Sequence, residues 1–217
     1  MLGSAFDPNA EFAIRETCKP HWAQAGAVVF LTFRLADSLP RELLRRWDRE
    51  RIDWLRRCGV SVPRRTDWKH AAARLDSRQA EQFRKHFRRQ YEDHLDLGLG
   101  DCLLGQPWAN EVVQQSLMRF DGERYRMGDY VVMPNHVHAL VVFPDPQTMS
   151  TQCAAWMRFT ARRINRRLNR TGRLWQPDPF DHLVRSPEQY DYLRHYIEQN
   201  PIKAGLKSGF GYRRSPS

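Results

Sequence analysis

The amino-acid sequence predicts an α+β fold built around one antiparallel sheet. The prediction depends on a strand pattern at 27–35, two adjoining strand patterns at 123–133 and 136–143, and helical patterns that alternate with them. A charged helical region at 40–100 interrupts this order after the first strand and reads as an insertion. Without it, the order is strand, helix, strand, strand, helix, strand, helix. This is the βαββαβ order of a ferredoxin-like sheet with one added C-terminal helix, and it predicts a single domain over 1–217.

The helices are expected where apolar residues recur at helical spacing: 40–57, 77–95, 106–120, 149–169 and 186–200. Pro107 and Pro187 stand at first-turn positions, and Ser186 is suited to cap the last helix, which Asn200-Pro201 is expected to end. Residues 175–185 are predicted to be extended with a short strand. The lead-in 1–20 is expected to be irregular and the glycine-rich basic tail 203–217 to be loose.

Composition narrows the class of protein. Thirty-five Lys and Arg against 25 Asp and Glu give a net charge of +10, and most of the basic residues are arginine, which suits bidentate contact with phosphate. No apolar run approaches the roughly 20 residues of a membrane span, and the N-terminus lacks a signal-peptide pattern. The four cysteines are scattered without a CxxC pair, which favours a reducing cytoplasm over a disulfide framework or zinc ribbon.

The helix expected at 149–169 is rich in arginine. No acidic residue falls between Ala154 and Gly172, so a salt-bridged face is not expected, and an anionic partner such as a phosphate backbone is favoured. Its apolar side is predicted to consist of Trp156, Phe159, Ile164 and Leu168. The arginines that form the predicted DNA-binding face are Arg158, Arg162, Arg163, Arg166 and Arg167.

A His-x-His pair opens the strand at 136–143. Side chains alternate along a strand, so His136 and His138 point to one face and Val137 to the other. Two imidazoles in this arrangement suit one divalent cation, although an exposed or hydrogen-bonded histidine pair gives the same pattern. In the predicted sheet this strand is central, which is a rigid place for a site.

Tyr196 and Asn200 are four residues apart and so share one face of the last helix. A phenol and an amide on one face can address a metal-bound phosphate together, with the amide oxygen as third ligand and the phenolate as nucleophile. A tyrosine with its ordinary pKa of about 10 needs a nearby cation for this role. Spacing alone favours Tyr196 as a core aromatic and Asn200 as a helix cap before Pro201, and Tyr190 and Tyr192 are equally available as nucleophiles.

The motif PNHVHALV, followed about 60 residues later by YIEQNPIKAGL, resembles the single-tyrosine HUH transposases, and especially the REP-associated tyrosine transposases. The connecting segments FLTFRLADSLP, FTARRINR and LWQPDPFDHLVRS are similar to the same family. The resemblance covers about 27–35 and 105–206 and leaves the 40–100 insertion without a readable motif.

The resemblance implies cleavage and transfer of single-stranded DNA at hairpin-flanked sites, through a 5′-phosphotyrosine intermediate and without a nucleotide cofactor. It implies Tyr196 as nucleophile, and His136, His138 and Asn200 as ligands of Mg²⁺ or Mn²⁺. The arginine helix would bind DNA, with Trp175 stacking on unpaired bases. The implied partner is single-stranded or hairpin DNA in the bacterial cytoplasm near the nucleoid, with no membrane contact, and the protein would be a monomer or homodimer.

Other readings stay open at the sequence level. One is a catalytically silent or domesticated protein that binds DNA hairpins, and another is a replication-initiator-type HUH nickase that shares the chemistry. A hydrolytic metalloenzyme is disfavoured because no further His or carboxylate stands at a recognised zinc spacing. His182 is assigned either a role beside the metal or a structural role, outside the ligand set.

Overall fold

The computed structural model describes residues 1–16, 20–96, 99–177 and 179–215. The chain divides into two compact units, each described separately below. Unit 1 combines Met1–Ser38 with Asp101–Ser217, and unit 2 is Leu39–Gly100. The region that the sequence sets apart as an insertion thus forms a compact unit of its own.

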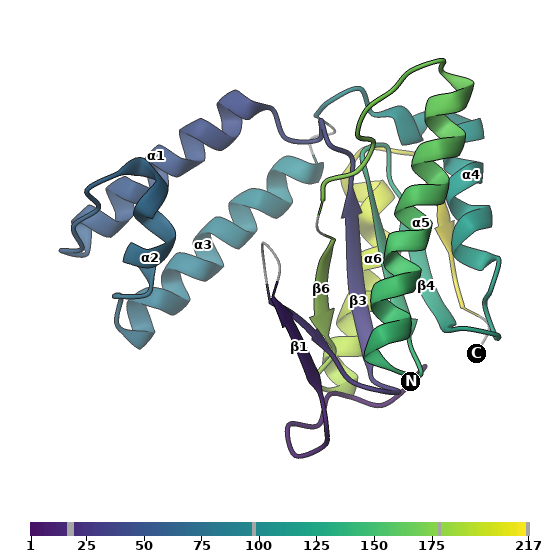
Figure 1. Cartoon of the computed structure of the whole chain (residues 1–217), viewed down its shortest axis with the longest axis horizontal. Coiled ribbons are helices and arrows are strands. Elements are labelled where there is room, and N and C mark those ends of the chain that lie inside the picture. The colour runs from purple at the N-terminus through teal and green to yellow at the C-terminus, as the bar shows by residue number, and fades with distance from the viewer. Residues whose placement is uncertain (17–19, 97–98, 178, 216–217) are drawn as a thin grey trace. The chain divides into compact units, whose positions relative to one another are not determined.

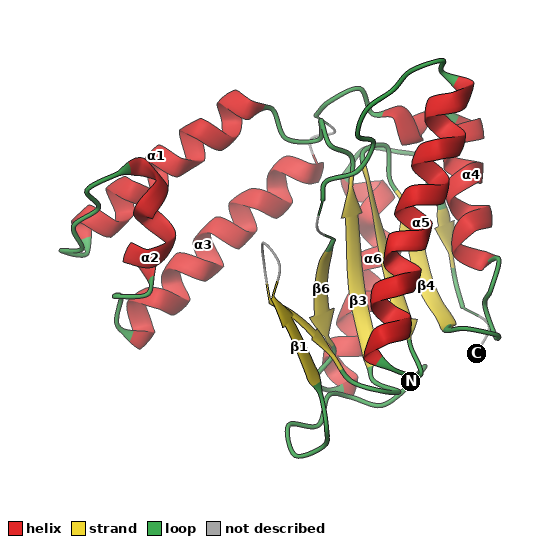
Figure 2. Cartoon of the chain, in the orientation of Figure 1, coloured by secondary structure: helices red, strands yellow, loops and turns green. Residues whose placement is uncertain are grey.

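Figure 1 labels the main elements, and Figure 2 separates helices from strands by colour. The strands are β1 (Ala13–Glu16), β2 (Pro20–Ala23), β3 (Val28–Arg34), β4 (Arg126–Val132), β5 (His136–Val142), β6 (Phe180–Leu183) and β7 (Tyr212–Arg213). The α-helices are α1 (Arg41–Arg57), α2 (Trp68–Ala72), α3 (Ser77–Asp96), α4 (Pro107–Met118), α5 (Pro146–Arg167) and α6 (Pro187–Lys203). Short 3₁₀ turns lie at Arg65–Asp67 and Leu103–Gly105. None of the helices in the described residues has the length and apolar character needed to cross a membrane.

A five-stranded antiparallel sheet in the order β6-β3-β5-β4-β7 forms the centre of unit 1. The prediction of a mixed fold with an antiparallel sheet is therefore confirmed. The predicted His-x-His strand is β5, which lies third in the sheet with a neighbour on either side. Its register with β3 places Thr32 opposite His138 and Arg34 opposite His136.

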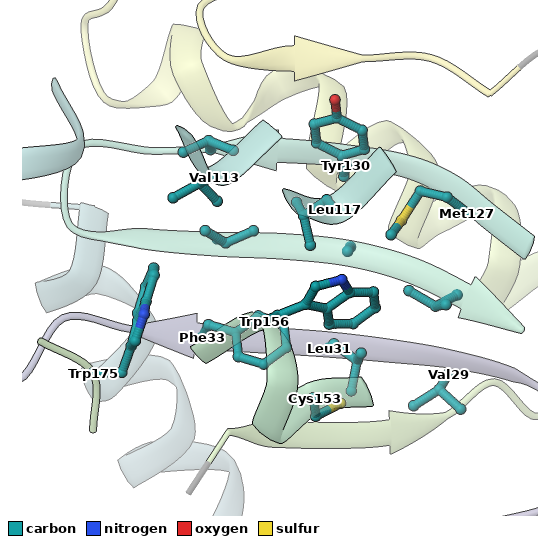
Figure 3. Close-up of a cluster of buried hydrophobic side chains, with 14 of the residues drawn as sticks. Val29, Leu31, Phe33, Val113, Leu117, Met127, Tyr130, Cys153, Trp156 and Trp175 are labelled. Atoms are coloured by element: carbon teal, nitrogen blue, oxygen red, sulfur yellow. The ribbon is translucent and has the colours of Figure 1, made fainter. Parts of the chain in front are cut away.

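Alternating side chains divide this sheet into two buried faces. One face packs against α4 and α5 and contains Trp156 and Trp175 beside Phe33, as Figure 3 shows. The other face packs against α6 through Phe30 and Leu140. Figure 1 shows α4 and α5 on one side of the strands and α6 behind them. Because side chains on a strand alternate, His136 and His138 share the α6 face with Leu140.

The lead-in and the tail are more ordered than predicted. Within 1–20, the segment Ala13–Glu16 pairs with Pro20–Ala23 in a hairpin, with residues 17–19 outside the described chain. In the tail, β7 pairs with β4, and Gly211 adopts a φ of +58° where an added Cβ would lie 2.2 Å from the Val132 carbonyl oxygen. Both predictions were wrong. The tail pairs with a strand about 80 residues earlier in the sequence, and the hairpin strands lack an alternating pattern, so local composition predicts neither pairing.

The last helix does not end at Asn200-Pro201. It continues through Pro201 to Lys203, and Ser186 caps its start as predicted by accepting a hydrogen bond from the Gln189 amide. Pro201 lacks the N–H that would donate to the Ile197 carbonyl, and the helix continues only two residues beyond it. Asn200 is therefore inside the helix, and its reading as a C-cap is wrong. The helix α5 likewise begins earlier than predicted, at Pro146, with Asp145 as its cap.

Unit 2 has a hydrophobic core that consists of its own residues. Ile52 and Leu55 of α1 pack with Phe83 and Phe87 of α3, and Ala71 of α2 completes the cluster. The described buried clusters of unit 1 include no residue of unit 2. Each unit therefore has a hydrophobic core of its own.

The cysteines give no sign of a disulfide framework in the described residues. Cys58, Cys102 and Cys153 are free, and Cys18 lies outside the part of the chain that the structure describes.

Candidate functional site

His136 and His138 lie at the start of β5 and are both buried, with exposed fractions of 0% and 4%. Their ring centroids are 4.6 Å apart at an interplanar angle of 69°. The reading of the pair as exposed histidines is therefore wrong, and the two rings share one small volume beneath α6.

The Nδ1 atom of each ring has a partner that orients the imidazole. His138 Nδ1 is 2.8 Å from Thr32 Oγ1, and His136 Nδ1 donates to Asn135 Oδ1 at 2.7 Å. The Nε2 atoms of both rings are buried and have no hydrogen-bond partner among the described residues. Since an amide oxygen only accepts, His136 carries its proton on Nδ1, and its Nε2 presents a lone pair.

Burial keeps both imidazoles neutral. Desolvation, assisted by the positive charge of Arg34, lowers the pKa of His136 to about 3, while the Asn200 side chain acts in the opposite direction. Desolvation also lowers the pKa of His138 well below its usual value, and His136 and Arg34 act in the same direction. Neutral imidazole is the form that binds metal ions.

The helix α6 places Asn200 and Tyr196 over the histidines. Asn200 is fully buried, and neither its Oδ1 nor its Nδ2 has a hydrogen-bond partner among the described residues. The Tyr196 ring is half-buried, with its centroid 5.3 Å from that of His138. Tyr190 is instead packed in the core, and Tyr192 is 67% exposed. Of these three tyrosines, Tyr196 has the ring contact with the histidine pair that the structure records.

The buried atoms without hydrogen-bond partners fit a divalent cation bound between the two histidines and Asn200. Two imidazole nitrogens and an amide group are buried without partners, which is costly unless a ligand satisfies them. No group of three or more His, Cys, Asp or Glu suited to a metal ion occurs in the described residues, so a carboxylate-rich site is absent there. A neutral donor set leaves the charge of a bound cation available to an anionic substrate.

Arg34 is a site residue that the sequence analysis missed. It lies opposite His136 in the β3–β5 register, is only 7% exposed, and its charge lowers the pKa of both histidines. The sequence signal is its position in a strand whose other residues, apart from Thr32 on the same face, are apolar.

The arginines of α5 are exposed and form no ion pair among the described residues, as predicted from the lack of acidic neighbours. The helix lies on the sheet face opposite the histidines, but its C-terminal half reaches the same end of the sheet. The Arg167 guanidinium lies 4.5 Å from the Trp108 ring centroid, and Leu104, just before Trp108, donates a hydrogen bond to the Pro134 carbonyl. The C-terminal half of the arginine helix and the histidine pair therefore lie at the same end of the sheet, on its opposite faces.

Two predictions about aromatic side chains are wrong. Trp175 is 5% exposed, packs beside Phe33, and donates from Nε1 to Thr160 Oγ1 at 2.8 Å, so its ring presents no face to a nucleobase. Phe159 and Leu168, predicted for the apolar side of α5, are 40% and 39% exposed. Trp156 and Ile164 define the side of α5 that packs on the sheet. Phe159 lies away from that side, where its ring contacts Arg163.

His182 lies on β6 opposite Phe30, and its Nε2 is 2.7 Å from Gln189 Nε2 at the start of α6. This contact joins β6 to α6 and supports the structural one of the two roles predicted for His182.

Comparison with known proteins does not assign the chain to a family. No protein-family model matches the chain, and a comparison with curated proteins finds no match. A solved structure of the REP-associated tyrosine transposase bound to a REP hairpin is similar at a TM-score of 0.45 and 15% identity, covering 85% of this chain and 72% of that chain. A TM-score below 0.5 is too low to assign either fold or activity.

Proposed function

We propose that the protein is a metal-dependent transposase of the REP-associated tyrosine type, which cleaves and rejoins single-stranded DNA at hairpin-flanked sites. In this proposal the sheet order β6-β3-β5-β4 is a ferredoxin-like core, β7 extends its edge, and α6 is the added helix that carries the nucleophile. The motifs PNHVHALV and YIEQNPIKAGL support the same assignment.

The main support for the proposal is that four side chains come together between β5 and α6: two histidines from the strand and an asparagine and a tyrosine from the helix. The Nε2 atoms of His136 and His138 and the amide of Asn200 are buried without partners, and the Tyr196 ring lies against His138. Single buried atoms without partners occur elsewhere in the protein, as at Trp156 Nε1, but here four such atoms belong to three neighbouring side chains, which favours a bound ligand. The same four positions are those that the family resemblance assigns to ligands and nucleophile.

His136, His138 and Asn200 would hold Mg²⁺ or Mn²⁺, and two imidazole ligands favour Mn²⁺ over Mg²⁺. When bound, the cation polarises a phosphodiester as a Lewis acid. Asn135 and Thr32 orient the two imidazoles toward it. The buried guanidinium of Arg34 contributes a second positive charge, which would neutralise a non-bridging phosphate oxygen.

The phenol oxygen of Tyr196 would attack the phosphorus in line with the leaving 3′-oxygen. A P–O bond to the tyrosine forms as the P–O3′ bond breaks, and the proton lost by the phenol is balanced by one gained at the 3′-hydroxyl through solvent. The phosphotyrosine bond stores the energy of the cleaved linkage, so the reverse attack by a 3′-hydroxyl rejoins strands without ATP. The Lys203 ammonium, 5.2 Å from the Tyr196 ring centroid, adds positive charge beside the phenol.

The DNA strand would pass around the end of the sheet at which β5 begins, from the histidine face to α5. There the exposed Arg158, Arg162, Arg163, Arg166 and Arg167 would contact phosphates, and Phe159 replaces Trp175 as the aromatic group suited to stack on an unpaired base.

The test is formation of a covalent protein–DNA band on a denaturing gel. Labelled hairpins from repeats that flank the gene are incubated with the protein and Mn²⁺ or Mg²⁺, with EDTA as the metal-free control. We expect a metal-dependent band that Tyr196→Phe abolishes without weakening DNA binding, because only a hydroxyl is lost. Tyr192→Phe, on the exposed side of α6, is the matched control and retains the band.

Three results would redirect the assignment. A band that persists in Tyr196→Phe and disappears in Tyr192→Phe would refute Tyr196 as nucleophile. Tight hairpin binding with no band under any metal would favour the silent DNA-binding protein. Cleavage of an origin-like site without strand transfer would favour the initiator-type nickase.

A further inference from the structure

Unit 2 has no role in the chemistry proposed above, yet it is the more basic part of the chain. Its 62 residues contain sixteen Lys and Arg against ten Asp and Glu, while the remaining residues contain nineteen against fifteen. More than half of the net positive charge therefore belongs to this smaller unit.

The acidic residues of unit 2 neutralise few of these cations. The ion pairs recorded among its described side chains join Arg46 to Glu50, Arg51 to Asp48 and Arg56 to Asp53. Nine further cations are exposed and take part in no ion pair among the described residues: Arg45, Arg49, Arg57, Arg64, Arg65, Lys69, Arg78, Arg84 and Lys85.

The spacing of these cations places them in rows. Arg45 and Arg49 are one turn apart on α1, and Arg78 and Lys85 are two turns apart on α3, so each pair shares one side of its helix. Like charges one turn apart destabilise an isolated helix. Folding does not require them either, because the core of the unit consists of apolar residues and these cations are exposed.

The aromatic residues of unit 2 indicate what kind of anion would fit. Trp47, Phe83 and Phe87 are buried, and Trp54 and Trp68 are partly covered through contacts with Phe83. None of the Trp and Phe side chains described in this unit is exposed. Proteins that hold single strands present aromatic faces for base stacking, whereas contact with a duplex backbone needs only cations.

We infer that unit 2 is a second DNA-binding module, which holds the phosphate backbone of duplex DNA flanking the cleaved strand through the exposed cations of α1 and α3. This inference rests on the proposed function for the identity of the DNA. It assigns single-strand contact to unit 1 and sequence-independent duplex contact to unit 2.

The test compares two DNA probes over a range of salt concentrations with the full-length protein. One probe is a hairpin with a long duplex stem next to the cleavable strand, and the other is the same strand without a stem. The variants are Arg45→Gln with Arg49→Gln and, separately, Arg78→Gln with Lys85→Gln. Glutamine keeps helix propensity at these exposed positions, so the fold is preserved.

The matched control is Arg119→Gln with Arg124→Gln, which removes the same charge from unit 1. These exposed arginines flank Phe120, near the end of β5 that is distant from His136. We expect each unit 2 variant to lower the slope of log affinity against log salt for the stem-bearing probe by up to about 2. The stemless probe loses much less affinity, and the control resembles the wild type on both probes.

Equal salt slopes for the unit 2 variants and the control would overturn the inference. So would wild-type protein that binds the stem-bearing probe no better than the stemless one, which would point to an acidic protein as the partner of unit 2. Adduct formation by the wild type on the stem-bearing probe reports on the proposed function separately. If the wild type forms no adduct but the unit 2 variants lose stem binding, the proposed catalysis fails and the duplex module stands.

Discussion

Thr32 and Asn135 determine how the two imidazoles present their nitrogens. Each of them contacts an Nδ1 atom, which leaves the Nε2 atoms of His136 and His138 buried without a hydrogen-bond partner among the described residues. Orienting partners of this kind commonly account for a substantial part of metal affinity. They also explain why the histidines tolerate burial: half of their hydrogen-bonding capacity is satisfied within the protein.

Thr32→Val should weaken metal binding while preserving the fold, because valine has nearly the same shape but cannot contact His138 Nδ1. We expect the affinity for Mn²⁺, measured by titration calorimetry, to fall about 10–100-fold. Thr151→Val, at an exposed threonine of α5, is the control and should bind Mn²⁺ as the wild type does. Equal affinities for the two variants would mean that Thr32 does not orient a ligand.

Arg34 should affect the reaction more than it affects metal binding. Arg34→Gln removes the positive charge that the proposed mechanism uses to neutralise the substrate phosphate, and we expect the rate of adduct formation to fall by about 10²–10³-fold. Arg34→Lys keeps the charge without the planar fork and should retain an intermediate rate. Mn²⁺ affinity is expected to stay equal or increase, because a repulsive neighbour of the cation is lost or moved. Loss of Mn²⁺ binding in both variants would indicate a structural role instead.

At the scale of elements, α6 is held over the histidine face by polar contacts as well as by its apolar side. Arg194 donates from Nε to Asp129 Oδ2 of β4 at 3.1 Å, and Asp129 is 1% exposed. The Tyr212 hydroxyl and the Ser215 amide donate to the same carboxylate. Burial next to Asp129 raises the pKa of Tyr212 to about 12, so this phenol stays protonated and able to donate.

Arg194→Ala should destabilise the fold by leaving the buried Asp129 carboxylate without its cation. We expect the free energy of unfolding, measured in urea, to fall by about 1–3 kcal/mol. Arg185→Ala is the control, because the Arg185 side chain is exposed and forms no ion pair in the described part of the chain. A loss of stability no larger than that of the control would show that the apolar contacts of α6 suffice.

At the scale of the whole molecule, unit 2 enters and leaves unit 1 at adjacent points. The Asp101 amide donates to Asp37 Oδ2 at 2.8 Å, so the two connections lie side by side. An insertion joined in this way can be shortened without stretching the chain, because the ends that remain are already close.

Replacing Leu39–Gly100 with a short Gly/Ser linker should therefore leave unit 1 folded. Cooperative unfolding followed by circular dichroism checks the fold, and adduct formation on a stemless strand checks the site. We expect both to be retained, because the described buried clusters of unit 1 contain no unit 2 residue. An unfolded product would show that unit 2 contributes to the stability of unit 1.

Much of this organisation is predictable from the sequence because it depends on local periodicity. Alternation along a strand places His136 and His138 on one face, and helical spacing places Tyr196 and Asn200 on one face. The order of elements and the arginine helix follow from the same short-range patterns. The burial of Trp175 and the outward turn of Phe159 do not, because a tryptophan or phenylalanine has the same local pattern whether it packs inward or faces solvent.

Only the tertiary structure decided which groups meet. The choice of Tyr196 over Tyr190 and Tyr192 depends on how α6 lies across β5, and the part of Arg34 depends on the register of two strands about 100 residues apart in sequence. The pairing of the tail with β4 is of the same kind. Local sequence determines the conformation and the exposed chemistry of each element, whereas contacts between distant segments are selected by burial and hydrogen bonding summed over the whole fold.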